Sequence, residues 1–347
     1  MLSRALLSLL VLPIAHAGVA QVSNIAARVD ATTGKTLDLH DGTTFRVNDT
    51  FFWVGAGYGP CTECPVSAGS GCCSIAVGAC GFNLNHTVNL ATSTDLVTWT
   101  FHGDILPADR PTGIVFSPWV AQSAETGNFV LWFNVLPVKG GTGDFDAAFY
   151  AVAQSASPFG PWSMANANVS GLAYNELPDA PSIFVDDDGD GYIAFTHEST
   201  HINHVQRLTR DLLGPLLPAV VGPQISGGNN EGILMFKRNG LYYVGFGQCC
   251  CFCASGANVQ LLVSYSPLGP YNSTGNLIPN GAAWGAQTGT IWFTGVDYVL
   301  FGDRWQSAPA PQRLKSEDFT YMSPIVWNAD GTPQPQPTFQ DTVVIRY

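Results

Sequence analysis

The stretch that decides the fold is Leu234-Met235-Phe236-Lys237-Arg238-Asn239-Gly240-Leu241-Tyr242-Tyr243, an apolar strand, a tight polar turn and a second strand rich in aromatic residues. The same pattern recurs in four other segments: 43–53, 119–133, 182–192 and 290–298. Outer segments repeat too, since 155–162 is echoed by 264–271 and 94–99 by 209–213. Helical periodicity is nearly absent. A sandwich would not repeat its inner hairpin five times, so the sequence predicts an all-β chain, a single five-bladed β-propeller with four-stranded antiparallel blades.

The N-terminus has the pattern of a secretory signal peptide. Arg4 precedes a short apolar run that ends in Ala15-His16-Ala17, which predicts a signal peptide over residues 1–17 and a catalytic propeller over 18–347. Four sequons begin at Asn48, Asn85, Asn168 and Asn272. Together with nine cysteines, they favour a secreted, extracellular glycoprotein.

The net charge of the chain limits the classes of molecule that it can bind. The chain has 14 Lys and Arg against 26 Asp and Glu, with a formal net charge of −12. This balance argues against nucleic acid and against an anionic membrane. A neutral polysaccharide or oligosaccharide is the partner that fits.

Polar residues stand at the start of the first strand of each predicted hairpin. In a propeller, the innermost strands of the blades converge on one central channel. The converging segments are His40-Asp41-Gly42, Ser117-Pro118-Trp119, Pro178-Asp179-Ala180, Asn229-Asn230-Glu231-Gly232 and Ala286-Gln287-Thr288. Carboxylates that face each other in one pocket suit cleavage of a glycosidic bond, in which one protonates the leaving oxygen and another activates water.

At these residues the sequence resembles glycoside hydrolase family 43. His40-Asp41-Gly42 followed by Phe51-Phe52-Trp53 is similar to that family's His-Asp-Pro and Tyr-Tyr blocks, which implies that Asp41 is the general base. The block 231–243 is similar to the one that carries the general acid, which implies that role for Glu231. The segment 182–189 resembles the block with the aspartate that modulates the acid, and Asp179 is the candidate for it.

The subfamily of exo-β-1,3-galactanases is more similar still. The segment 116–132 looks like its second blade, and Gln287 with 302–305 looks like its fifth, where the glutamine faces the reacting water. Three positions depart from that group. It usually has Gly at the Asp41 position, its modulating aspartate would fall on Ala180 in strict register, and it carries Arg where this chain has Ser117. A one-residue slip turns a side chain to the other face of a strand unless a bulge absorbs it.

The resemblance implies an inverting, exo-acting glycosidase on a neutral plant-type polysaccharide such as β-1,3-galactan. The alternatives are an α-L-arabinofuranosidase or β-xylosidase of the same family, and a carbohydrate-binding propeller without catalysis. Catalysis is assigned to Asp41, Glu231 and Asp179, and substrate contact to Gln287, Trp119, His40, Trp305 and His197. His201 is the alternative to His197 for a place in the channel lining, because it also follows the third hairpin. Trp53, Tyr58 and Trp284 are further candidates for stacking on sugar.

Neither a cofactor nor a metal site is predicted, although some relatives hold an ion in the channel. Asp186-x-Asp188-x-Asp190-Gly191 imitates an EF-hand loop but has His197 at the twelfth position, so a hairpin turn is the better interpretation. The cysteines form two clusters, 61–80 and 249–253. Disulfides that staple the loops around the active site are expected there, with one cysteine left over.

Overall fold

The computed structural model describes residues 18–62, 77, 82–173, 179–197, 200–228, 230–248, 254, 256–279, 286–309 and 313–347. The predicted signal peptide, Trp284 and every cysteine except Cys61 therefore lie outside the described residues. None of the described segments forms a helix with the length and hydropathy that a bilayer crossing requires.

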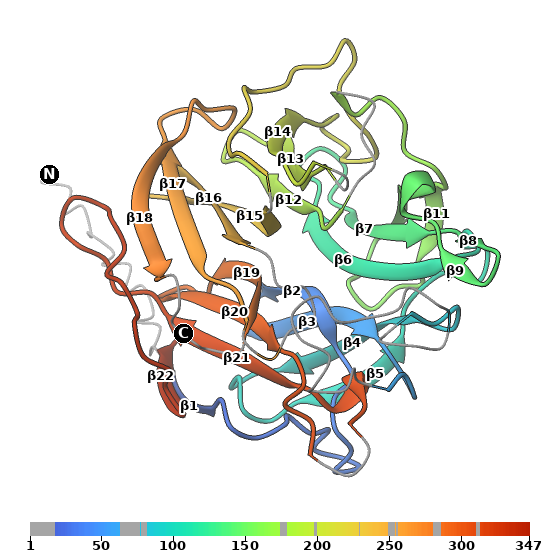
Figure 1. The fold of residues 1–347 in the computed structure, drawn as a ribbon, viewed down its shortest axis with the longest axis vertical. Coiled ribbons are helices and arrows are strands. Elements are labelled where there is room, and N and C mark those ends of the chain that lie inside the picture. Colours follow the sequence, from blue (N-terminus) through green and yellow to red (C-terminus); the bar gives the residue numbers. More distant parts are fainter. Residues whose placement is uncertain are drawn as a thin grey trace, which may run out of the picture.

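Five antiparallel sheets stand around a central axis, which confirms the predicted five-bladed propeller (Figure 1). Blade I contains β2 (His40–Val47), β3 (Thr50–Gly57), β4 (Thr87–Ser93) and β5 (Thr100–Asp104). Blade II contains β6 (Ile114–Gln122), β7 (Phe129–Leu136), β10 (Phe149–Ser155) and β11 (Ser163–Asn166). Blade III contains β12 (Ser182–Val185), β13 (Gly191–Thr196) and β14 (Asn203–Arg207). Blade IV contains β15 (Asn230–Arg238), β16 (Leu241–Gln248), β17 (Val259–Ser264) and β18 (Asn272–Ile278). Blade V contains β19 (Gln287–Phe293), β20 (Tyr298–Arg304) and β21 (Phe319–Pro324).

All five predicted hairpins are the inner hairpins of the blades: β2–β3, β6–β7, β12–β13, β15–β16 and β19–β20. The turn between β15 and β16 is Asn239-Gly240 with both φ angles positive, the conformation that an Asn-Gly hairpin favours. The similar outer segments 155–162 and 264–271 also take equivalent places, because each joins the third and fourth strands of its blade.

Two blades are less regular than predicted. Blades III and V contain three regular strands each among the described residues. In blade III, residues 214–225 run along β14 through backbone bonds such as Arg207 N to Val220 O at 2.9 Å, in the place of a fourth strand. The strand signal is weak there because the segment contains three prolines, Pro215, Pro218 and Pro223, which cannot donate to a ladder.

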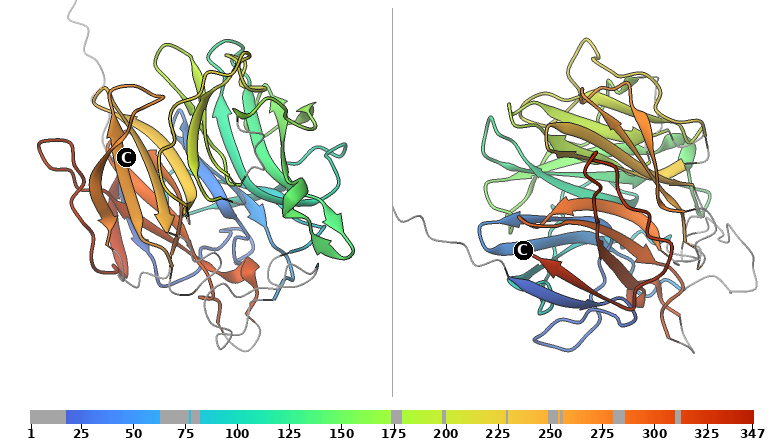
Figure 2. Two further views of the ribbon diagram at one scale, coloured as in Figure 1. Left: turned by 45° about the horizontal axis from the view of Figure 1, so that its top comes forward. Right: turned by 90° about the vertical axis from the view of Figure 1, so that its left-hand side faces the viewer.

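The hydrophobic core lies between neighbouring blades. Five apolar clusters fill the five junctions of the ring, so each blade is buried on both faces. At the junction of blades V and I, the cluster also contains side chains of β1 (Val19–Ser23) and β22 (Thr342–Arg346), which pair antiparallel. The two terminal strands therefore close the ring, and they lie together at its edge (Figures 1 and 2).

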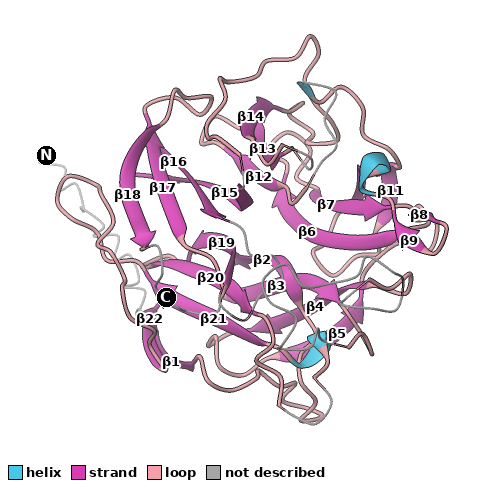
Figure 3. Cartoon of the chain, viewed as in Figure 1, coloured by secondary structure: helices cyan, strands magenta, loops and turns pink. Residues whose placement is uncertain are grey.

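The part of the chain that the structure describes is almost entirely strand and loop (Figure 3). Two single-turn 3-10 helices, η2 (Phe145–Ala147) and η4 (Lys315–Glu317), contribute side chains to the central site or its rear wall. A small ribbon of β8 (Val138–Lys139) and β9 (Thr142–Gly143) extends blade II at its edge.

Candidate active site

A cavity of about 340 Å³ lies where the innermost strands of the five blades meet. Each of the five segments singled out from the sequence contributes to its lining. The contributing residues are Asp41, Ser117, Trp119, Asp179, Ala180, Glu231, Gly232, Gln287 and Thr288. The ring geometry thus brings together residues that lie up to 262 positions apart in the chain, from Asp41 to Asp303.

A β-bulge in the inner strand re-aims four of the five segments toward the cavity, those of blades I, II, IV and V. In blade I the register passes from His40–Ala56 to Thr43–Val54, so two residues oppose one. Blades II, IV and V show the same shift at 116–119, 231–234 and 288–290. Bulges re-aim side chains and are frequent beside active sites. The one-residue mismatch that the sequence raises lies at Asp179 and Ala180, just before β12, whose pairing with β13 shows no register shift.

Three bulges share an unusual backbone conformation. Asp41, Ser117 and Gly232 occupy equivalent places in blades I, II and IV, with φ of 51°, 45° and 64°. Residues other than glycine seldom adopt this region, and they do so where surrounding contacts hold them. Asp41 and Ser117 are therefore held in strained positions on the cavity wall.

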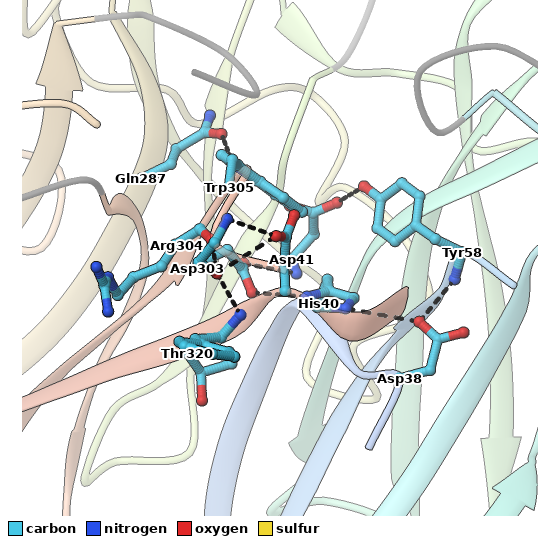
Figure 4. A network of polar contacts seen from close by, with 12 residues as sticks. Asp38, His40, Asp41, Tyr58, Gln287, Asp303, Arg304, Trp305 and Thr320 are labelled. Atoms are coloured by element: carbon cyan, nitrogen blue, oxygen red, sulfur yellow. Dashed lines mark hydrogen bonds and ion pairs between the residues drawn. The ribbon is translucent and has the colours of Figure 1, made fainter. Parts of the chain in front are cut away.

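Two neighbouring side chains, Asp303 and Tyr58, hold Asp41 by hydrogen bonds (Figure 4). Its backbone N–H donates to Asp303 Oδ2 at 2.9 Å, and the Tyr58 hydroxyl donates to its carboxylate. Burial, followed by the neighbouring charge of Asp303, raises the pKa of Asp41 to about 7. Tyr58, His40 and Lys315 act in the opposite direction and favour the ionised carboxylate. Asp41 is thereby poised to exchange a proton near neutral pH.

Behind Asp41 lies a buried ionic group. His40 is fully buried, with Nδ1 at 3.2 Å from Asp303 Oδ1 and Nε2 at 3.6 Å from Asp38 Oδ1. Burial alone would lower the pKa of His40, but Asp303 and Asp38 outweigh it and raise that pKa to about 9. Lys315 adds a second buried cation, with Nζ at 3.9 Å from the centre of the Trp305 ring. Two cations thus face the acidic side chains behind the cavity.

Glu231 lies across the ring in blade IV. Gln287 Nε2 donates to Glu231 Oε2 at 3.2 Å, and His201 Nδ1 lies 3.5 Å from Glu231 Oε1. Gln287 is itself oriented by Trp305, whose Nε1–H donates to Gln287 Oε1 at 2.7 Å (Figure 4). The chain of contacts Trp305–Gln287–Glu231 therefore fixes the carboxyl of Glu231 from blade V.

Asp179 precedes β12 and faces the same cavity, as does Ala180, so the slip in register does not turn Asp179 away. Its backbone N–H donates to Thr196 O at 3.1 Å, which ties it to the end of β13. Burial raises the pKa of Asp179, while the charge of His201 lowers it. His201 thus acts on both Asp179 and Glu231.

Three expected substrate contacts lie elsewhere. His40 and Trp305 have 0% and 1% of their surfaces exposed and stand behind the cavity lining, where they hold Asp303 and Gln287. His197 is absent from the lining among the described residues, and His201 takes that place. The cause is a loop: His201 N donates to His197 O at 2.7 Å, in a turn that carries His201 inward.

Of the aromatic candidates for stacking that the structure describes, Trp119 lines the cavity. Trp53 and Tyr58 are buried, at 1% and 0% exposure, and their surfaces are used in packing. Trp53 packs in the junction of blades V and I. Tyr58 packs on Trp305 and Cys61, and its hydroxyl donates a hydrogen bond to Asp41. Cys61, the first residue of its cluster, thus lies beside the site, while the predicted disulfides involve residues outside the described ones.

Several cavity residues could not be assigned a role from the sequence. Asp303 stood in a recognised motif, Gly302-Asp303-Arg304-Trp305, but its contacts depend on pairing between blades V and I. The apolar half of the wall contains Phe82, Phe116, Leu136 and Phe145, and Asn134 adds an amide. Phe116 belongs to the inner strand β6, whereas the others come from a loop, from η2 and from the second strand β7, whose position at the cavity no local pattern indicates.

The described residues contain no cluster of three or more His, Cys, Asp or Glu side chains placed to hold a metal ion. The EF-hand-like segment is the hairpin turn between β12 and β13, as predicted. Its Asp186 accepts from Lys237 Nζ and the Tyr242 hydroxyl, and Asp190 pairs with Arg207. Those carboxylates neutralise basic side chains of neighbouring strands.

The fold and the site define a five-bladed propeller with four carboxyl side chains from four blades around one cavity. The sequence profile of glycosyl hydrolases family 43 matches residues 79–333. The chain belongs to glycosyl hydrolases family 43. The matched region contains Asp179, Glu231 and Gln287, and Asp41 precedes it.

Two relatives that bear the names of glycoside hydrolases match part of this chain. An arabinoxylan arabinofuranohydrolase of Bacillus subtilis is 26% identical over 302 residues, which are 73% of this chain and 55% of the relative. A β-D-galactofuranosidase of Aspergillus niger is 30% identical over 234 residues, 60% of this chain and 63% of the relative. The chain thus spans between half and two thirds of the length of these two relatives.

Among solved structures, an exo-β-1,3-galactanase of Phanerochaete chrysosporium with β-1,3-galactotriose superposes with a TM-score of 0.71. It is 22% identical, and the match covers 93% of this chain and 67% of that one. At this identity the likeness establishes the shared fold.

Proposed function

We propose that this protein is an inverting glycoside hydrolase in which Asp41 activates water and Glu231 protonates the leaving oxygen. The observation that carries the proposal is the meeting of Asp41, Glu231 and Asp179, from blades I, IV and III, in one cavity of about 340 Å³. Family membership supplies the reaction class, the hydrolysis of an O-glycosyl bond.

The proposed reaction needs one base and one acid on opposite sides of the sugar. Asp41 removes a proton from water as the water oxygen attacks the anomeric carbon. Glu231 transfers its proton to the glycosidic oxygen as the bond from that oxygen to the anomeric carbon breaks. Asp179 and His201 adjust the proton affinity of the site from blade III, and Gln287 orients the Glu231 carboxyl.

The cavity lining favours a neutral sugar. Four carboxyl side chains, Asp41, Asp179, Glu231 and Asp303, face a single histidine, His201, among the described lining residues. An anionic substrate would meet like charge. The opposite wall is apolar and aromatic and suits the hydrophobic face of a sugar ring. The volume is at the small end of the range for ligand pockets, about 300–1,000 Å³, which favours release of a terminal sugar.

For the substrate we propose β-1,3-galactan, with arabinofuranosidase activity as the second candidate. The galactanase from Phanerochaete chrysosporium shares this fold over 93% of the chain, which supports the first. The name of the Bacillus subtilis relative and its 26% identity support the second. Binding without hydrolysis is the third outcome to be tested.

The test is an assay of the full chain on β-1,3-galactan, arabinoxylan and aryl β-galactosides, β-xylosides and α-L-arabinofuranosides. The anomer of the first product is read by proton NMR. Galactose released with inverted configuration supports the proposal, and arabinose released instead selects the second candidate. A product of retained configuration contradicts Asp41 as a base, and binding without any product leaves a lectin-like protein.

We also propose that the protein is secreted and N-glycosylated. The asparagine of every sequon, Asn48, Asn85, Asn168 and Asn272, is solvent-exposed and thus accessible to modification. Intact mass of the protein recovered from the medium of a eukaryotic host, before and after enzymatic deglycosylation, tests this. A protein retained in the cells, or one of unchanged mass, contradicts it.

A further inference from the structure

Asp303 is a buried carboxylate that joins the last blade of the ring to the first. It belongs to β20, has 2% of its surface exposed, and borders the cavity. Both of its oxygens are directed at consecutive residues of blade I: Oδ2 accepts from Asp41 N at 2.9 Å, and Oδ1 lies 3.2 Å from His40 Nδ1. The side chain of Asp303 thus contacts two consecutive residues of blade I, His40 and Asp41 (Figure 4).

The His40–Asp41 turn needs contacts of this kind to keep its conformation. Asp41 has a φ of 51° inside the bulge of β2, a conformation that a residue with a side chain keeps only when its surroundings hold it. Gly42 follows, packed so closely on blade I that an added Cβ would meet Val54 O at 1.8 Å. The bond from Asp41 N to Asp303 is the contact that fixes this turn from the neighbouring blade.

We propose that Asp303 is the positioning residue for Asp41, holding the His40–Asp41 turn and controlling through its charge when Asp41 can act as a base. This inference rests on the proposed function, because it assigns a role within the same site. It concerns a contact between blades V and I, from Asp303 to the backbone N–H of Asp41.

The charged and titratable groups around Asp41 come from four elements. They are His40 of β2, Tyr58 after β3, Asp303 of β20 and Lys315 of η4. Burial and the charge of Asp303 raise the pKa of Asp41, and the other three lower it. Asp303 is thus the nearby carboxylate that delays the ionisation of Asp41. It also keeps His40 protonated, so the imidazolium balances its charge.

A purely structural role for Asp303 is the competing interpretation. In that case Asp303 would serve as the counter-ion of buried His40, and its removal would reduce stability without changing the proton affinity of Asp41. The two roles differ in one measurable property, the pH at which Asp41 ionises.

The experiment compares Asp303→Asn with Asp297→Asn in the full chain. Asp297 is also a buried carboxylate of blade V, but it lies in the turn between β19 and β20 and pairs with Arg346 at 2.6 Å, away from the cavity lining. The carboxyl titration of Asp41 is followed by carbon-13 NMR on aspartate-labelled protein, with Asp41→Asn identifying its resonance. The pH profile of kcat/KM is measured in parallel on the substrate that the panel selects.

We expect Asp303→Asn to lower the titration midpoint of Asp41 by about one pH unit, because a like charge is removed. The acidic limb of the kcat/KM profile should move to lower pH by the same amount. At the pH optimum, kcat should fall because the turn is held less firmly. Asp297→Asn should leave the midpoint and the profile where they are in the native protein.

An unchanged Asp41 midpoint in folded Asp303→Asn overturns the proposal, whatever happens to stability. If that variant fails to fold, the test is made on the native protein by the same carbon-13 titration. The carboxyl resonance of Asp303 must then show an inflection at the pH at which Asp41 ionises, and this inflection must vanish in Asp41→Asn. Its absence refutes the inference. If no substrate is hydrolysed, the proposed function fails, while the carboxyl titration still tests Asp303 independently.

Discussion

Replacement of Asp41 by Asn should stabilise the fold in a way that depends on pH. In the folded protein burial and Asp303 raise the pKa of Asp41 from 3.8 to about 7. Between those two values the folded protein holds a proton that the unfolded chain has released. The free energy of unfolding therefore falls as the pH rises through this window.

The size of the effect follows from the difference in pKa. At about 1.4 kcal/mol per pH unit, a rise from 3.8 to about 7 corresponds to about 4 kcal/mol. Asp41→Asn removes this cost, and the amide oxygen can still accept the bond from the Tyr58 hydroxyl. The variant and the native protein should therefore be equally stable below about pH 4, and the variant more stable by up to about 4 kcal/mol above pH 7.

The assay is urea unfolding followed by tryptophan fluorescence at several values between pH 4 and pH 8.5, with native protein and variant in parallel. Glu125→Gln removes one carboxylate from an exposed turn and controls for the change of net charge. A constant difference between variant and native protein across the pH range would refute the reasoning. A variant that is less stable at pH 8 than the native protein would refute it too.

Three further predictions concern the acid, the bulge and the buried histidine. Glu231→Gln should lower kcat about 10²–10⁴-fold without changing the midpoint of urea unfolding. The loss of kcat should be smallest for an aryl glycoside with a very acidic leaving group, because that group needs least protonation. An equal loss of kcat for all leaving groups would contradict the acid role. Gly42→Ala places a Cβ 1.8 Å from Val54 O and should lower the free energy of unfolding by more than about 1 kcal/mol. The control Gly227→Ala adds a Cβ in open space and should change this free energy little. Similar denaturation curves for the two variants would contradict the close packing at Gly42. His40, with its pKa raised from 6.5 to about 9, should contribute up to about 3 kcal/mol of stability that is complete below pH 6.5 and lost as the pH rises through 9. Urea unfolding of His40→Gln against native protein checks this, and a gap that widens above pH 9 would contradict it.

The interior of this active site shows why the inner strands could be predicted and the supporting contacts could not. Asp41, Glu231 and Gln287 stand at the beginning of repeated hairpins, so their common place in successive blades follows from the repeat. His40 and Trp305 carry equally suggestive side chains in the same motifs. Their burial depends on the packing of blade V against blade I, which the sequence of neither blade describes.

Register is the second property that sequence patterns left open. Alternation predicts which face of a strand a residue occupies, but a bulge changes that face for every residue beyond it. The bulges at 41–42, 117–118 and 232–233 place their residues toward the cavity. Asp41 and Ser117 do so with a positive φ, a conformation that residues other than glycine seldom adopt, and the strand pattern around them did not indicate it.

The sequence alone determined the ring of five hairpins and the set of segments that meet at its axis, because both depend on local patterns repeated along the chain. The tertiary structure decided which side chains enter the cavity, and it placed Asp303 against Asp41 and His40. The physical reason is that burial and charge act between blades: a carboxylate 262 residues away from Asp41 in sequence hydrogen-bonds to its backbone and controls its proton.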